Sequence, residues 1–174
     1  MSLVSRADTD ALKWYPVYTH PRAEKRAHAA LSDKGIVSYL PLHRQLKQWS
    51  DRKKWVEVPL IKSYLFVKIA EHRQSEVLMT KGIARFIYFS NKITSMPEKQ
   101  IEDLKLLMAS PYDLEITEEN LGAGEKIIIK AGPLKGLQGE VIAYRSQKSL
   151  ILRLNNLGCS IIVNVAASLI ERFN

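Results

Sequence analysis

The hydrophobic pattern in the first two thirds of the chain alternates between a period typical of strands and one typical of helices. Residues 13–19 are rich in aromatic and β-branched residues, which indicates a strand. Pro16 within this segment predicts an edge position or a bulge. Further strands are predicted at residues 36–46, 54–58, 64–69 and 84–89. The segment 64–69 is apolar at nearly every position, so we expect it to be central and buried on both faces.

Three helices are predicted between and after these strands. The first is capped by Thr19 or His20, has Pro21 in its first turn and ends at Gly35. Its apolar stripe consists of small residues that allow close packing on a sheet, namely Ala23, Ala27, Ala30 and Leu31. A short helix is expected at 71–81, and a capping box at 95–98 starts the third. The resulting β-α-β-β-β-α-β-α order predicts an α+β domain with a mainly antiparallel sheet and flanking helices.

The character of the chain changes after residue 110. Short apolar segments separated by Gly, Pro and Asn turns predict strands at 126–130, 139–144, 150–154 and 159–163. Several short strands in about fifty residues are typical of a small β-barrel. We therefore expect a first domain at 12–110, an acidic linker at 111–121 and a second domain at 122–174.

Charge and composition narrow the function classes. The net charge is +8, and the predicted linker separates two basic segments. A basic surface favours binding to polyanions such as nucleic acids, although a solvated surface is the alternative. The sequence has neither an apolar run long enough to span a membrane nor a signal-peptide core, so we expect a cytoplasmic protein. The single cysteine, Cys159, excludes an internal disulfide and predicts a buried thiol.

Two stretches of the sequence together carry a family resemblance. The first contains Trp14–Tyr15, Pro21–Glu24, Leu40–Leu42 and Pro59–Val67, and the second extends from Gly124 to Val141. The first resembles the N-terminal (NGN) domain of NusG-type transcription factors, and the second resembles a KOW motif, which implies an SH3-like barrel. The whole resembles the specialised paralogs of the family, including the UpxY-type antiterminators. It departs from the family pattern at Lys62-Ser63, where members usually have Pro-Gly.

The resemblance implies an elongation regulator that binds RNA polymerase and promotes antitermination. Family members bind the clamp helices of the largest subunit through an apolar pocket, which matches Tyr18, Ile61, Tyr64 and Phe66 here. Tyr64 and Phe66 are two residues apart in a predicted strand and therefore share a face. The alternative is that all four fill the domain core. Gln74 and Ser75 match the polar residues that contact the gate loop of the second-largest subunit.

Basic residues form the second predicted site, for non-template DNA or nascent RNA. The helix face supplies one cluster, the hairpin tip supplies another, and one lysine matches a DNA-proximal position of the paralogs. These residues are His20, Arg22, Lys25, Arg26, Arg52, Lys53, Lys54 and Lys81. Cations position phosphates, and the nearby Trp49 and Trp55 offer surfaces for base stacking. The alternative for each cation is an ordinary solvated side chain.

The resemblance to a KOW domain implies that the second domain binds a ribosomal protein or a termination factor. Its predicted partner surface consists of a strand and the following turn, with the residues Ile127, Ile129, Gly132, Pro133, Leu134, Lys135 and Gly136. Abundant Ile and Val favour strands over helices in this domain.

The sequence contains no motif that indicates catalysis. Its four histidines lack metal-ligand spacing, and neither a phosphate-binding loop nor a nucleophile motif is present. We expect no enzyme activity, no cofactor, no metal, no membrane contact and a monomer. The alternative functions are a KOW-type RNA-binding or ribosome-associated protein and, third, a small RNA-processing enzyme.

Overall fold

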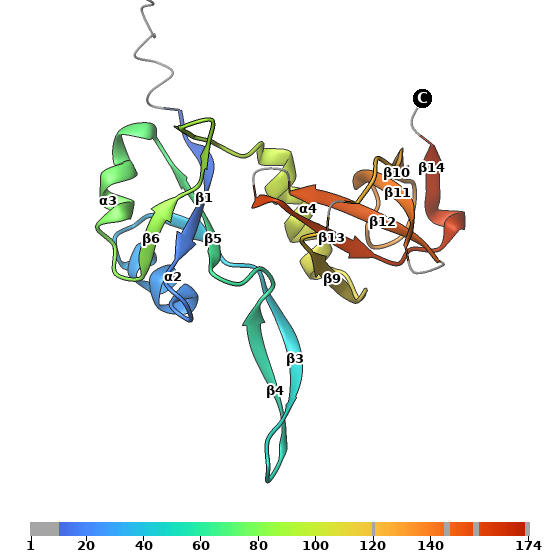
Figure 1. Cartoon of the computed structure of the whole chain (residues 1–174), viewed down its shortest axis with the longest axis horizontal. Coiled ribbons are helices and arrows are strands. Elements are labelled where there is room, and N and C mark those ends of the chain that lie inside the picture. The colour runs from blue at the N-terminus through green and yellow to red at the C-terminus, as the bar shows by residue number, and fades with distance from the viewer. Residues whose placement is uncertain (1–10, 120, 145–146, 155–156, 173–174) are drawn as a thin grey trace, which may run out of the picture. The chain divides into compact units, whose positions relative to one another are not determined.

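The computed structural model describes residues 11–119, 121–144, 147–154 and 157–172 (Figure 1). The chain forms two units, with the division between Glu98 and Lys99. Both contain antiparallel sheets with few helices, which confirms the predicted α+β class.

The first unit is built on a four-stranded sheet in the order β2-β5-β1-β6. Its strands are β2 (Val37–Tyr39), β5 (Tyr64–Ile69), β1 (Lys13–Thr19) and β6 (Ile83–Phe86), and each neighbouring pair is antiparallel. The apolar strand β5 lies between β1 and β2, so the prediction that it is central is confirmed.

Strand β1 is also an inner strand, so the edge position predicted from Pro16 is wrong. The alternative was a bulge, and the register of β1 with β6 does shift nearby, between Tyr18 and Thr19. The carbonyl of Pro16 accepts a hydrogen bond from the N–H of Ile87, just after β6 has ended. In an antiparallel strand the N and C=O of one residue face the same neighbour. The missing N–H of Pro16 therefore faces the end of β6 and removes no bond to β5.

Helices cover one face of this sheet. They are α2 (Glu24–Asp33), the 3₁₀ turn η1 (Glu71–Arg73) and α3 (Gln74–Leu78). The core on this face includes Val17, Leu31 and Val67, all with no exposed surface. A Cβ at Gly82 would lie 3.1 Å from the Cβ of Ala27, so Gly82 and the small residues of α2 allow the close packing expected from sequence.

The start of α2 differs from the prediction. The helix begins at Glu24, and Ala23 at its N-terminus provides no side-chain cap. Arg22 has a positive φ of 60°, which turns the chain sharply before the helix. The hydroxyl of Thr19 is buried without a hydrogen-bond partner within the described residues, so it is not the cap.

The loop before β5 adopts the backbone conformation that the usual Pro-Gly of the family would favour. Ser63, at the position of the Gly, has a φ of 61°. Its N–H donates to Oε1 of the buried Glu24 at 2.8 Å, and its carbonyl accepts from the N–H of Thr19 at 2.8 Å. These two bonds hold the left-handed conformation, which costs a non-glycine residue about 1 to 2 kcal/mol.

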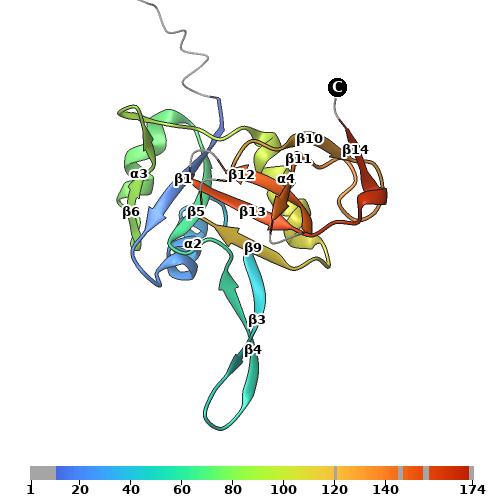
Figure 2. The same ribbon diagram turned by 45° about the vertical axis from the view of Figure 1, so that its right-hand side comes forward.

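A long hairpin projects from the first unit (Figures 1 and 2). It consists of β3 (Leu42–Gln48) and β4 (Lys53–Pro59). We predicted one strand over 36–46, but the chain breaks at Leu40-Pro41. The two parts join different sheets, since β2 pairs with β5 and β3 with β4. A smaller hairpin follows β6, formed by β7 (Tyr88–Phe89) and β8 (Lys92–Ile93).

The second unit contains most of helix α4 (Glu98–Ala109) and a six-stranded antiparallel sheet. In sheet order the strands are β14 (Ile170–Arg172), β10 (Glu125–Ile129), β11 (Gln138–Tyr144), β12 (Gln147–Leu154), β13 (Cys159–Val163) and β9 (Leu114–Thr117); the 3₁₀ turn η3 (Ala167–Leu169) precedes β14. This sheet-rich unit is consistent with a KOW domain. The division between the units falls after Glu98, the first residue of α4, whereas we expected the first domain to end at residue 110.

The acidic segment is not a free tether along its whole length. Leu114–Thr117 form β9, which pairs with β13. Leu114 and Ile116 alternate with Glu115 and Thr117, which is the period of a strand. The four acidic residues obscured this pattern in the sequence.

An ion pair joins the end of this segment to the sheet of the second unit. Arg153 donates from Nε and Nη2 to the two carboxylate oxygens of Glu140, both at 3.0 Å. Arg153 also donates to the carbonyls of Leu121 and Gly122, while the N–H of Gly124 donates to Glu140 at 2.8 Å. The hydrogen bond from Arg153 lowers the pKa of Glu140 most; burial opposes it, and the Gly124 N–H lowers the pKa further.

Replacing Ser63 with glycine should stabilise the protein by about 0.5 to 1 kcal/mol, because it removes the left-handed strain while keeping the N–H bond to Glu24. The control is Ser32→Gly in the exposed part of α2, which should destabilise by a similar amount. Urea unfolding measures both changes. A change in the free energy of unfolding with the same sign in both variants would contradict the strain assigned to Ser63.

Stability should depend on Glu140 in a defined pH range. The folded pKa of Glu140 is lowered, so its contribution is present above the ordinary glutamate value of about 4.3 and is lost as the pH falls through the folded pKa. We expect Glu140→Gln to lose about 1 to 2 kcal/mol at pH 7 and much less near pH 3. Urea unfolding at both pH values tests this. A loss of the same size at both would refute the assignment.

Candidate functional site

The face of the first sheet opposite its helices carries a row of aromatic side chains. Alternation along β1 and β5 directs Tyr18 and Tyr64 to this face, and the two residues lie opposite each other in the strand register. Their rings meet edge to face with centroids 5.2 Å apart. Both are half-buried, so part of each ring remains accessible.

Phe66 and Tyr39 extend this row to β2. They are register partners, and their rings stack with centroids 6.3 Å apart. Phe66 has no exposed surface, whereas Tyr39 is half-buried. Burial raises the pKa of Tyr39 to about 12, so its hydroxyl stays protonated and can donate a hydrogen bond at neutral pH. We call Trp14, Tyr18, Tyr39, Tyr64 and Phe66 the aromatic face.

Charged side chains border the aromatic face. The guanidinium of Arg85 lies 5.2 Å from the ring centre of Tyr18, within the range of a cation–π contact. Nζ of Lys68 lies 5.8 Å from the ring of Trp14 and 3.0 Å from the carboxylate of Glu98, which also accepts from Trp14 Nε1. An apolar centre with a charged rim is the arrangement of many protein interfaces.

The four predicted pocket residues divide into two groups. Tyr18 and Tyr64 are in contact and partly exposed, while Ile61 and Phe66 are buried. Ile61 lies in the loop before β5, where its carbonyl accepts from the N–H of Tyr64. None of the four belongs to the hydrophobic cluster beneath the helices. They are therefore not core residues of the helix-covered face.

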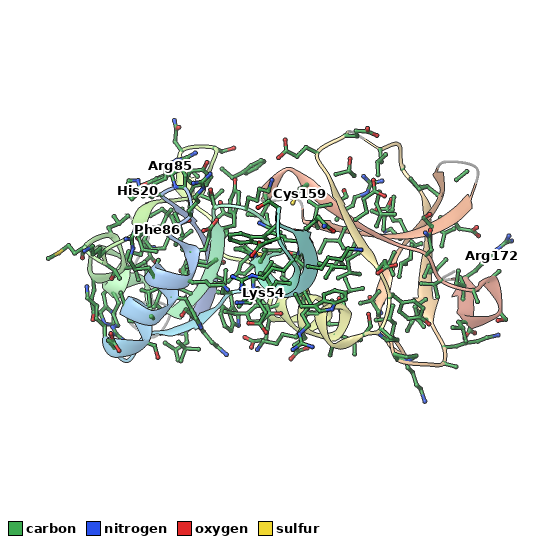
Figure 3. All side chains as sticks on the ribbon, turned by 90° about the horizontal axis from the view of Figure 1, so that it is seen from below. His20, Lys54, Arg85, Phe86, Cys159 and Arg172 are labelled. Atoms are coloured by element: carbon green, nitrogen blue, oxygen red, sulfur yellow. The ribbon has the colours of Figure 1, made fainter. Side chains whose placement is uncertain are left out.

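The predicted cations near α2 are all exposed. His20, Arg22, Lys25 and Arg26 lie at or just before the start of the helix. The N–H of His20 donates to the carbonyl of Gly82, and the preceding Thr19 pairs with Ile83 of β6, the strand that also carries Arg85 (both labelled in Figure 3). The basic start of α2 therefore lies beside the edge of the sheet that carries Arg85.

The hairpin cations and tryptophans are also exposed. Arg52 precedes β4, and its contact with Asp51 at 4.0 Å is between two largely exposed side chains, so it contributes little. Lys53 and Lys54 begin β4, and Lys54 is shown on the hairpin in Figure 3. Trp49 and Trp55 are 54% and 62% exposed, which is unusual for large aromatic side chains and leaves their rings accessible. The exposed Lys81 lies between α3 and β6.

The predicted gate-loop residues lie at the start of α3. Ser75 is exposed, and Gln74 is half-buried. Burial and the nearby Glu71 raise the pKa of Tyr15, whereas a side-chain hydrogen bond with Gln74 lowers it. Gln74 is thus engaged with the helix-side core, and Ser75 is the more accessible of the two.

The predicted partner surface of the second unit needs correction. Ile127, Ile129 and Leu134 are only 1 to 2% exposed, so their side chains belong to the core of this unit. The remaining residues of the set are exposed: Gly132, Pro133, Lys135 and Gly136. They form a turn in which Gly136 donates its N–H to the carbonyl of Ile129 at 2.8 Å. The accessible part of the predicted surface is therefore the turn alone.

Trp14, Tyr39 and Arg85 are residues of the site that sequence analysis did not assign to it. Tyr39 and Arg85 contact the predicted aromatic residues, but they lie on β2 and β6. Strand pairing places both at the site, because Tyr39 pairs with Phe66 and Arg85 pairs with Tyr18. The sheet order was needed to bring them together.

Metal binding, membrane-spanning helices and cysteine reactivity were considered for the part of the chain that the structure describes. No group of three or more His, Cys, Asp or Glu side chains there is arranged to hold a metal ion. None of the helices in those ranges has the length and apolar character needed to cross a bilayer. Burial raises the pKa of Cys159 to about 11, so the thiol is protonated and unreactive at neutral pH, in line with the predicted buried cysteine.

Comparison with known proteins supports one family. The family model described as "Transcription termination factor nusG" matches residues 12–105, more than half of the chain. No curated protein sequence matches significantly.

Among solved structures, NusG of Thermotoga maritima shares the fold. It has 15% identity and a TM-score of 0.53, and the match covers 94% of this chain and 98% of that one. A second likeness is to conformation A of the MjSpt4:Spt5 complex, with 17% identity, a TM-score of 0.33 and coverage of 92% and 98%. The matched family model and the shared fold show that this chain belongs to the NusG family of transcription factors.

Proposed function

We propose that this protein is a non-enzymatic regulator of transcription elongation that binds RNA polymerase through the aromatic face and promotes antitermination, in the manner of the specialised UpxY-type factors. The observation that carries the proposal is the contact between Tyr18 and Tyr64 on the helix-free face of the sheet. Half-buried tyrosines combine apolar area with a hydroxyl, which suits the centre of a protein interface.

The clamp helices of the largest polymerase subunit are the proposed ligand of this face. A helix presents an apolar ridge that fits a shallow aromatic surface, as in other helix-in-groove contacts. Tyr18 and Tyr64 supply the accessible contact, while the buried Phe66 and Ile61 hold the rings and the preceding loop in place. The exposed Arg85 at the rim attracts acidic side chains of the partner, while Lys68 is already paired with Glu98.

The other surfaces have supporting roles in the proposal. Ser75 at the start of α3, with Gln74, contacts the gate loop of the second-largest subunit and so bridges the cleft of the polymerase. The exposed cations of α2 and the hairpin contact non-template DNA or nascent RNA. The turn Gly132–Gly136 of the second unit contacts a ribosomal protein or a termination factor, and the protein acts as a monomer.

Tyr64→Ala should weaken binding to core RNA polymerase at least tenfold, because it removes a central aromatic contact worth about 2 kcal/mol. The matched control is Tyr88→Ala, which removes an exposed tyrosine of the β7–β8 hairpin and should leave affinity unchanged. Affinity is measured by biolayer interferometry, and melting temperatures show that both variants fold. Equal affinities for the two variants would remove the aromatic face from the proposal.

Whether the protein shortens or lengthens transcriptional pauses is a separate prediction. In single-round transcription with purified polymerase, the protein should shorten pauses and increase read-through of a terminator, because bridging the cleft holds the clamp closed. Ser75→Arg should reduce the effect on pausing while retaining polymerase affinity, since it adds bulk only at the gate-loop contact. Longer pauses with the native protein would contradict antitermination while leaving polymerase binding intact.

A further inference from the structure

A groove of about 630 Å³ lies between the start of α2 and the base of the β3–β4 hairpin. Arg22 and Lys25 line it from the helix side, Lys62 from the loop before β5, and His43 and Lys47 from β3. Three segments that are separate in the sequence therefore direct basic side chains into one groove. Of these residues, only Arg22 and Lys25 belong to the cations predicted from sequence.

Strand alternation explains how the hairpin contributes to the groove. Lys47 lies four positions after His43 in β3, and an even spacing along a strand directs both side chains to the same face. Lys54 lies directly opposite Lys47 in the hairpin register and therefore shares this face. Trp55 is the next residue of β4, so its ring belongs to the other face of the hairpin.

The groove has a strong excess of positive charge. Arg22, Lys25, Lys47 and Lys62 are exposed, and within the described residues no ion pair neutralises any of them. The acidic residue that lines the groove is Glu24, which is 7% exposed and accepts the N–H of Ser63. Its carboxylate is thus engaged by the protein backbone.

The hairpin carries a destabilising feature at the same place. Two like charges directly opposite each other in an antiparallel pair, as with Lys47 and Lys54, weaken the pairing. A polyanion bound along this face would offset the repulsion.

We propose that this groove binds the sugar–phosphate backbone of a nucleic acid strand, independently of base sequence. Cations at several points along a groove can contact successive phosphates of one strand, and such contacts position a strand without reading its sequence. Among the described residues, no Phe, Tyr or Trp lines the groove, so they offer no platform there for base stacking. The inference rests on the nucleic-acid part of the proposed function and assigns it to Lys47 and Lys62, beside the sequence-predicted Arg22 and Lys25.

The test measures affinity of the full-length protein for fluorescein-labelled DNA and RNA of about 20 nucleotides, single-stranded and duplex, in two unrelated sequences. Titrations between about 50 and about 300 mM KCl give the slope of log K against log salt. Lys47→Gln and Lys62→Gln should each reduce the slope by about 0.7 to 0.9 and weaken both sequences equally. The form bound most tightly identifies which backbone occupies the groove.

The control is Lys92→Gln, which removes an exposed lysine of β8 outside the groove and should leave the slope unchanged. Lys47→Gln removes a repulsive pair, so its melting temperature should not fall. Unchanged slopes for both groove variants, an equal change for Lys92→Gln, or a marked sequence preference would each overturn the proposal. Tyr64→Ala should keep the native slope, so failure of polymerase docking and failure of the groove are distinguishable.

Discussion

The alternation of side chains across one four-stranded sheet is the constraint on which the first unit depends. Val17 and Val67 point toward the helices and are fully buried, while their neighbours Tyr18 and Phe66 point the other way. Burial of one face stabilises the sheet by about 1.5 to 3 kcal/mol for each large apolar side chain. With this face covered, the opposite face can carry partly exposed aromatic residues without loss of the fold.

A single loop connects the two proposed interfaces. Glu24 begins α2, accepts the N–H of Ser63 and lines the basic groove, while Ser63 immediately precedes Tyr64 on the aromatic face. The carboxylate therefore orients both the start of the basic helix and the strand that carries the aromatic residues. This physical link explains how the usual Pro-Gly of the family can be replaced by Lys62-Ser63 while the left-handed turn is retained.

The local pattern of apolar and polar residues was sufficient to predict most strands and helices of the fold. The features that it did not predict depend on pairing between segments that are distant in sequence. The apolar content of β5 was enough to identify it as a central strand. Pro16 led to the wrong prediction of an edge strand, because its missing N–H faces the end of β6 and leaves the pairing with β5 intact. The acidic residues around Leu114 hid β9, whose partner β13 is far away in sequence. In the site, Tyr18 and Tyr64 followed from the family resemblance, whereas Tyr39, Arg85 and Lys47 required the sheet and hairpin registers.

The central claim is that the aromatic face is the surface that docks on RNA polymerase. Photo-crosslinking from a benzoylphenylalanine placed at position 18, in an assembled elongation complex, tests it most directly, with position 88 as the control site. The account predicts crosslinks from position 18 to the clamp helices of the largest subunit and none from position 88. Crosslinks from position 88 alone, or from position 18 to nucleic acid only, would contradict it.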